Sequence, residues 1–78
     1  MNEGQERFFN FIMERVMDGK HDEAKALLNQ GFEKQADGTF DMAFINEFSS
    51  KLFPIIKPEF AEEVKSIITN DGPRHIRK

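Results

Sequence analysis

The sequence contains no cysteine, only two histidines and no long apolar run. Without cysteine there is no disulfide framework, no thiolate nucleophile and no cysteine-based zinc site. Small secreted domains often depend on disulfides, so this composition favours a reducing cytoplasm. The longest unbroken apolar run, residues 42–45, is far shorter than the ~20 residues of a membrane span. We therefore expect a cytoplasmic protein that has no membrane segment and no signal peptide.

Charge is distributed unevenly along the chain. The formal net charge is −3, but Arg74, Arg77 and Lys78 all lie among the last five residues. The rest of the chain is therefore acidic, with a net charge of −6. An acidic body repels nucleic acid, and three basic residues neutralise few phosphates. A nucleic-acid-associated accessory protein that binds through Arg74, Arg77 and Lys78 is therefore the alternative prediction and not the first one.

Apolar residues are most concentrated in residues 40–60, which hold five of the nine phenylalanines. Phe, Ile, Leu and Val together make up 21 of the 78 residues, well above the content of about 20% below which chains are disordered. A chain of this length forms one domain with little stability to spare. The flanking segments must therefore cover the apolar stretch to form a core.

Residues 3–18 are predicted to form the first helix. Five apolar residues follow the helical spacing i, i+3, i+4, i+7 and i+8: Phe9, Ile12, Met13, Val16 and Met17. The second helix begins near residue 22, and its end is ambiguous. It could stop at Gly31 in a left-handed cap, or continue to Ala36 with Gly31 inside its apolar stripe. We expect the continuous helix, ended by Asp37-Gly38.

Two further helices are predicted in the second half of the chain. Asp41 is a good N-cap for the third helix, which ends near Leu52 because Pro54 disfavours helix at the residue before it. Residues 53–57 form a bend with the two isoleucines tucked inward. Pro58 suits the first position of the fourth helix, and residues 70–73 end that helix.

The sequence thus predicts an all-α fold, a small up-and-down bundle of four short helices. Residues 1–72 are the single helical domain, and residues 73–78 are a flexible basic tail that is dispensable for folding. A hairpin around Asp37-Gly38 is the main alternative, but its flanks do not alternate. The predicted core consists of Phe9, Ile12, Val16, Leu28, Phe44, Ile45, Phe48, Leu52, Phe60, Val64 and Ile67.

Signals for catalysis or metal binding are weak. Residues 37–41 resemble the middle of an EF-hand loop, but the closing bidentate position falls on Phe44, which cannot bind calcium. His21 and His75 belong to no metal motif, and the serines lack a recognisable nucleophile motif. The acidic residues at 59, 62 and 63 follow a polar helix face. We therefore expect no enzymatic activity, no metal and no cofactor.

The excess of apolar residues points to an interaction surface. On a helical wheel, Phe11 falls outside the core-facing stripe, about 60° beyond Phe8. We predict that Phe8, Phe11, Arg15 and Asp18 bind a partner, most simply a twofold-related copy in a homodimer, or else an unidentified protein. Phe11 could instead pack under the bend at 53–57. The predicted function is that of a small non-enzymatic interaction protein that self-associates through an apolar helix face.

Overall fold

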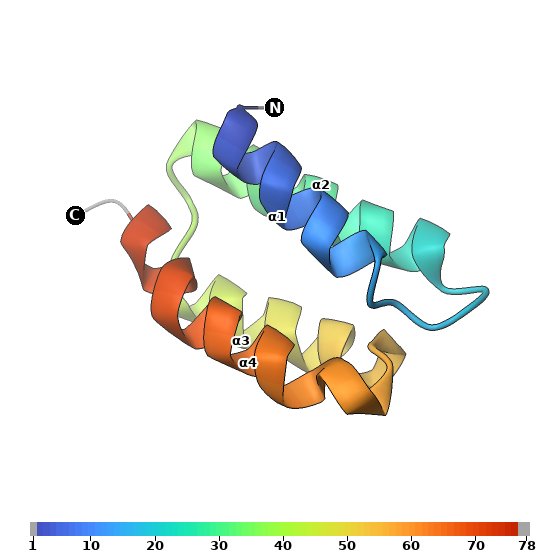
Figure 1. Cartoon of the computed structure of the whole chain (residues 1–78). Coiled ribbons are helices and arrows are strands. Elements are labelled where there is room, and N and C mark those ends of the chain that lie inside the picture. The colour runs from blue at the N-terminus through green and yellow to red at the C-terminus, as the bar shows by residue number, and fades with distance from the viewer. Residues whose placement is uncertain (1, 77–78) are drawn as a thin grey trace.

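The chain forms two helical hairpins that pack as two layers. The computed structural model describes residues 2–76, in which the α-helices are α1 (Glu3–Met13), α2 (His21–Asp37), α3 (Met42–Leu52) and α4 (Ala61–Asp71). Figure 1 shows α1 beside α2 in one layer and α3 beside α4 in the other, with successive helices antiparallel. The predicted all-α, up-and-down bundle of four helices is confirmed. Among these residues, no helix is long and apolar enough to cross a membrane.

The first helix is shorter than predicted. It begins with a capping box, in which the Asn2 side chain accepts from the Gln5 N–H at 2.8 Å and the Gln5 side chain accepts from the Asn2 N–H at 3.0 Å. It ends at Met13, so the prediction of a helix to Asp18 is wrong. Val16 is buried as expected. It lies outside the helix because its backbone pairs with that of a residue far along the chain.

That partner is Ile56, and the two residues form an isolated antiparallel bridge. The Met17 N–H donates to the Ile55 carbonyl at 2.8 Å, and the Lys57 N–H donates to the Arg15 carbonyl at 2.9 Å. The Val16–Ile56 bridge therefore joins the α1–α2 connection to the α3–α4 connection. Both connections lie at the end of the bundle opposite the chain termini (Figure 1). The two hairpins are thus tied together at one end.

The second helix runs through Gly31 without a break, as expected, and ends at Gly38. Gly38 has a φ of 80°, the left-handed conformation that favours glycine, and its N–H donates to the Lys34 carbonyl. Gly31 is buried, and a Cβ atom built on it would lie 3.7 Å from the Phe44 ring. The missing side chain at Gly31 therefore leaves room for the aromatic ring of α3.

The stretch that resembles an EF-hand loop is a turn followed by a helix cap. The Asp37 carboxylate accepts from the Thr39 hydroxyl and N–H, and these two bonds lower the pKa of Asp37. The turn is stabilised by the ionised carboxylate, so this contribution is lost as pH falls through the lowered pKa. Asp41 accepts from the Phe44 N–H at 2.8 Å, which confirms the predicted N-cap.

Short 3-10 helices connect and extend the second hairpin. They are η1 (Phe53–Ile55), η2 (Pro58–Phe60) and η3 (Gly72–His75). Pro58 opens η2 and not α4 itself, so α4 begins three residues later than predicted, at Ala61. Ile55 and Ile56 are buried in the bend, as the sequence predicts.

Eight of the eleven predicted core residues are buried: Ile12, Val16, Leu28, Phe44, Ile45, Phe48, Leu52 and Val64. The other three, Phe9, Phe60 and Ile67, are half-buried. Ala24, Leu27 and Ile68 join the buried core together with the isoleucines of the bend. In α4, Val64 and Ile68 are buried, whereas Ile67 lies at the edge of the buried face.

The structured region extends past residue 72, where the sequence placed the start of the tail. Residues 72–75 form η3, and Ile76 packs against the core. The Gly72 backbone lies against Ile45, since a Cβ there would be 3.6 Å from its side chain. Part of the predicted tail is therefore a short helix next to the core. Arg77 and Lys78 lie outside the described residues.

The buried glycine inside α2 and the exposed glycine that caps it give a matched pair of predictions. Gly31→Ala should stabilise the protein by about 1 kcal/mol, because alanine favours a helix interior and the Cβ meets only an ordinary contact. Gly38→Ala should destabilise it by about 1–2 kcal/mol, because alanine disfavours positive φ. Urea denaturation measures both. If Gly31→Ala destabilised the protein as much as Gly38→Ala, the added methyl group would clash with the Phe44 ring, which would contradict the ordinary contact at 3.7 Å.

Candidate binding cavity

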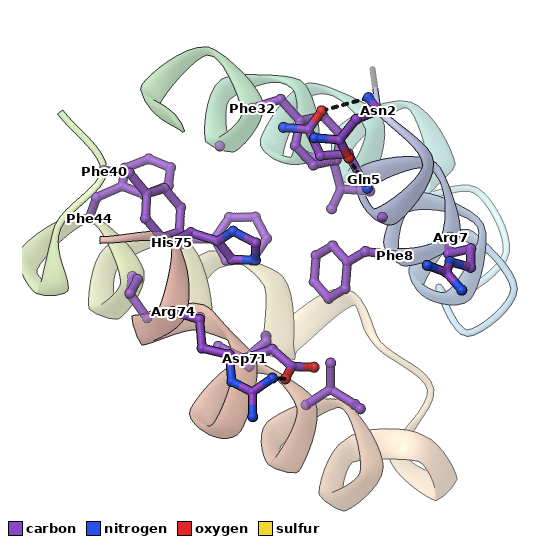
Figure 2. Close-up of a pocket in the computed structure, with 18 residues that line it drawn as sticks. Asn2, Gln5, Arg7, Phe8, Phe32, Phe40, Phe44, Asp71, Arg74 and His75 are labelled. Carbon is purple, nitrogen blue, oxygen red and sulfur yellow. Dashed lines mark hydrogen bonds and ion pairs between the residues drawn. The ribbon is translucent and has the colours of Figure 1, made fainter. Parts of the chain in front are cut away.

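A cavity of about 430 Å³ lies between the two hairpins at the end where the termini lie. All four helices contribute apolar side chains to its wall (Figure 2). Five of the nine phenylalanines line it: Phe8, Phe32, Phe40, Phe44 and Phe48. The remaining apolar residues of the lining are Leu28, Ile45, Ile67 and Ile68. The volume falls within the ~300–1,000 Å³ that is typical of small-molecule sites.

The start of α3 builds one aromatic wall of this Phe-lined cavity. Phe44 and Phe48 lie four residues apart on one face of α3, and Phe40 directly precedes the N-cap, Asp41. The Phe40 and Phe44 ring centroids are 5.5 Å apart, and those of Phe44 and Phe48 are 6.0 Å apart. Such ring pairs stabilise one another. The wall is therefore set by α3 and by its contact with Gly31 of α2.

Polar side chains surround the mouth of the cavity. Asn2 and Gln5 bond to each other in the capping box, and the Gln5 amide also donates to Gln35 at 2.8 Å. Their hydrogen-bonding groups are thus used within the chain. Figure 2 shows Phe8 and His75 on opposite sides of the opening. The mouth is therefore a gap between α1 and the η3 segment.

The η3 segment contributes the groups at the mouth that have few partners. The His75 ring lies edge-on to Phe40, with 6.2 Å between the ring centroids. Arg74 lies 3.9 Å from Asp71, too far for a hydrogen bond, and 79% of its side chain is exposed. Among the side-chain hydrogen bonds within residues 2–76, none involves Arg74. Its guanidinium is therefore accessible to a group at the mouth.

The four residues predicted to bind a partner lie in different surroundings. Phe8 lines the cavity, whereas Phe11 is half-buried against the core and is covered by Arg15. Asp18 is exposed in the α1–α2 connection. The expected grouping assumed a helix that continued to Asp18, and α1 ends at Met13.

Arg15 is engaged within the chain. Its guanidinium carbon lies 3.8 Å from the Phe11 ring centroid and 5.3 Å from that of Phe60. It also forms an ion pair with Glu63 and donates to the Phe11 carbonyl at 2.9 Å. Only 21% of its side chain is exposed. Arg15 thus links the Phe11 backbone to the start of α4. Its contacts are structural, although the sequence predicted that it binds a partner.

The residues of the alternative prediction are only partly described. Arg74 lies at the cavity mouth beside a carboxylate, and Arg77 and Lys78 fall outside the described residues. Glu59 and Glu62 are exposed, and the third carboxylate of that helix face pairs with Arg15. Within residues 2–76, no three potential ligands lie together to hold a metal ion.

Two signals in the sequence could have indicated the cavity. One is the four-residue spacing of Phe40, Phe44 and Phe48 about the start of the third helix, where neighbouring rings lie in contact. The other is Gly31 within an apolar stripe, which marks a place where a side chain is missing from a packed face. Neither signal specifies how far apart the hairpins lie, because that depends on contacts between distant residues.

Comparison with protein-family models, with curated proteins and with solved structures gave no match. The proposals below therefore depend on the geometry of this chain.

The contact between Arg15 and Phe11 gives a testable coupling. A double-mutant cycle with Arg15→Lys and Phe11→Leu should give a coupling of about 0.5–1 kcal/mol, because lysine loses the planar stacking of the guanidinium. Lys51→Ala, in an exposed pair with Glu47, is the control and should change stability by less than about 0.5 kcal/mol. Strictly additive effects of the two substitutions would contradict the contact.

Proposed function

We propose that the protein is a small non-enzymatic interaction protein that takes an apolar group of its partner into the Phe-lined cavity. The observation that carries this proposal is the distribution of apolar side chains. More than half of the phenylalanines line one open cavity. Elsewhere within residues 2–76, Met42 is the one large hydrophobic residue that is exposed, with 48% of its surface accessible. Concave apolar sites of this size are typical of binding sites.

The physical cost of an open cavity supports the same proposal. Protein interiors are close-packed, and side chains that line a void lose dispersion contacts. A chain of 78 residues has little stability to offset such a loss. An occupant that buries its own apolar surface against Phe32, Phe40 and Phe48 would restore those contacts. The cavity is therefore better explained as a site for an occupant than as a packing feature.

The lining also favours binding over catalysis. Its titratable side chains are two arginines, Asp71 and His75. No hydrogen bond orients His75 among residues 2–76, whereas a general base needs a partner that fixes its geometry. We further propose a cytoplasmic location, because the chain has no cysteine to form stabilising disulfides.

Self-association is the second candidate function, and the position of Phe8 favours it. Phe8 is half-buried at the cavity mouth, where a second copy could cover it. Phe11 is less suited to a dimer contact because Arg15 already covers its ring. A twofold dimer would therefore meet at the cavity mouth and not along the predicted face.

Binding of a neutral apolar fluorescent probe tests the leading proposal. The wild type should bind one probe per chain, and Gly31→Met should abolish binding because a flexible side chain at this position enters the cavity. Gly31→Ala is the matched control and should retain binding, since its methyl group makes only an ordinary contact. Circular dichroism confirms that each variant is folded. Equal binding by the wild type and Gly31→Met would contradict the proposal.

Light scattering tests the second candidate. If the chain self-associates at the mouth, the wild type is a dimer at micromolar concentration and Phe8→Glu is a folded monomer. Phe11→Glu should instead lower stability, because it removes the ring that packs beneath Arg15. A wild type that is monomeric at high micromolar concentration would exclude self-association and leave the cavity open to another partner.

A further inference from the structure

We propose that the occupant of the cavity is a small monocarboxylate with a hydrocarbon chain, held with its chain inside the cavity and its carboxylate at Arg74. This inference rests on the function proposed above and names the ligand class for the same site. It follows from two features of the cavity. The interior is apolar and aromatic, and the more exposed of the two paired charges at the mouth is a cation.

The interior of the cavity indicates the chemistry of the part of the ligand that enters it. Apolar side chains from all four helices form the wall, and the polar groups lie at the mouth. A group that carried hydrogen-bonding atoms deep into this wall would lose its bonds to water without replacement, which is costly. An unbranched hydrocarbon chain has no such atoms, and each buried methylene adds favourable transfer free energy. The part of the ligand inside the cavity is therefore hydrocarbon.

The charged groups at the mouth indicate the head group of the ligand. Arg74 is 79% exposed, and its ion pair with Asp71 at 3.9 Å is longer than a hydrogen bond. Exposed pairs of this kind are weak, whereas a carboxylate that accepts two parallel N–H bonds from a guanidinium is bound strongly and directionally. A ligand carboxylate would therefore compete well with Asp71 for Arg74.

The exposure of the charged groups at the mouth favours an anionic head group over a cationic one. The Arg74 side chain is 79% exposed, whereas that of Asp71 is 51% exposed. An amine at the mouth would meet Asp71 only next to Arg74, which repels it. The guanidinium is thus the more exposed of the two charges at the mouth, which favours an anionic ligand.

The two arginines of the lining differ in the direction of their side chains (Figure 2). Arg7 lies on the outer side of α1 with its guanidinium away from the opening, whereas Arg74 lies beside Asp71 below the opening. The two residues carry the same charge but differ in access to the mouth. Substitution of Arg7 therefore controls for the general effect of removing a positive charge.

Calorimetric titration with octanoate and 1-octanol tests the head group. The wild type should bind octanoate more tightly than octanol, and Arg74→Gln should lower octanoate affinity about fivefold, because it removes the charge-assisted bonds. Asp71→Asn should raise octanoate affinity, because it frees Arg74 and removes a repelling charge. Arg7→Gln should change it less than twofold. Octanol affinity should stay the same in all three variants.

The chain-length dependence tests the placement of the hydrocarbon. Octanoate should bind about fourfold more tightly than heptanoate, and heptanoate about fourfold more tightly than hexanoate, as expected for each buried methylene. The cavity-filled Gly31→Met should bind none of the three acids. An affinity that did not depend on chain length would show that the acid binds at the surface, and would overturn the inference.

The outcomes separate this inference from the function on which it rests. If octanoate and octanol bound equally well and Arg74→Gln changed neither affinity, the carboxylate assignment would be wrong, while the cavity would remain an apolar binding site. If neither ligand bound and the neutral probe did not bind either, the proposed function would itself be wrong. If Arg7→Gln weakened octanoate as much as Arg74→Gln, general electrostatics would explain the preference, and the assigned position of the carboxylate would be wrong.

Discussion

The Val16–Ile56 bridge is the constraint on which the arrangement of this bundle depends. Two backbone hydrogen bonds join the α1–α2 connection to the α3–α4 connection. Each bond contributes only about 0.5–1.5 kcal/mol, but together they fix how the hairpins meet. The bridge requires an extended backbone at Val16, so it ends α1 at Met13 and brings Arg15 over the Phe11 ring. Because the hairpins are tied at this end, any separation between them appears at the other.

The Phe-lined cavity lies at that other end, and its position links the fold to the proposed function. Phe44 and Phe48 of α3, together with the preceding Phe40, form one wall of the cavity, and Phe44 lies next to Gly31. The η3 segment then closes part of the opening, with Ile76 packed against the core and His75 against Phe40. The two hairpins are thus joined at the bridge and enclose an apolar cavity near the termini.

Local signals in the sequence predicted most of the helices, and long-range contacts account for what they missed. The Asp41 cap, the end of α2 at Asp37-Gly38 and the buried bend were predictable because each depends on neighbouring residues. The end of α1 was not, because Val16 and Met17 fit the helical period and only a residue 40 positions away draws them out of the helix. The partner-binding face assigned to Phe11 depended on that longer helix. The cavity was not predictable either, because the distance between hairpins is a tertiary property.

The central claim is that an apolar group occupies the cavity at the open end of the bundle. Nuclear Overhauser effects between bound octanoate and the methyl groups of the protein test this claim most directly, because they report proximity and not affinity. The account predicts cross-peaks from the ligand chain to Leu28, Ile67 and Ile68, which line the cavity, and none to Ile12 or Ile55, which are absent from its lining. Cross-peaks to Ile12 and Ile55 alone, or no cross-peaks with a ligand shown to bind, would contradict it.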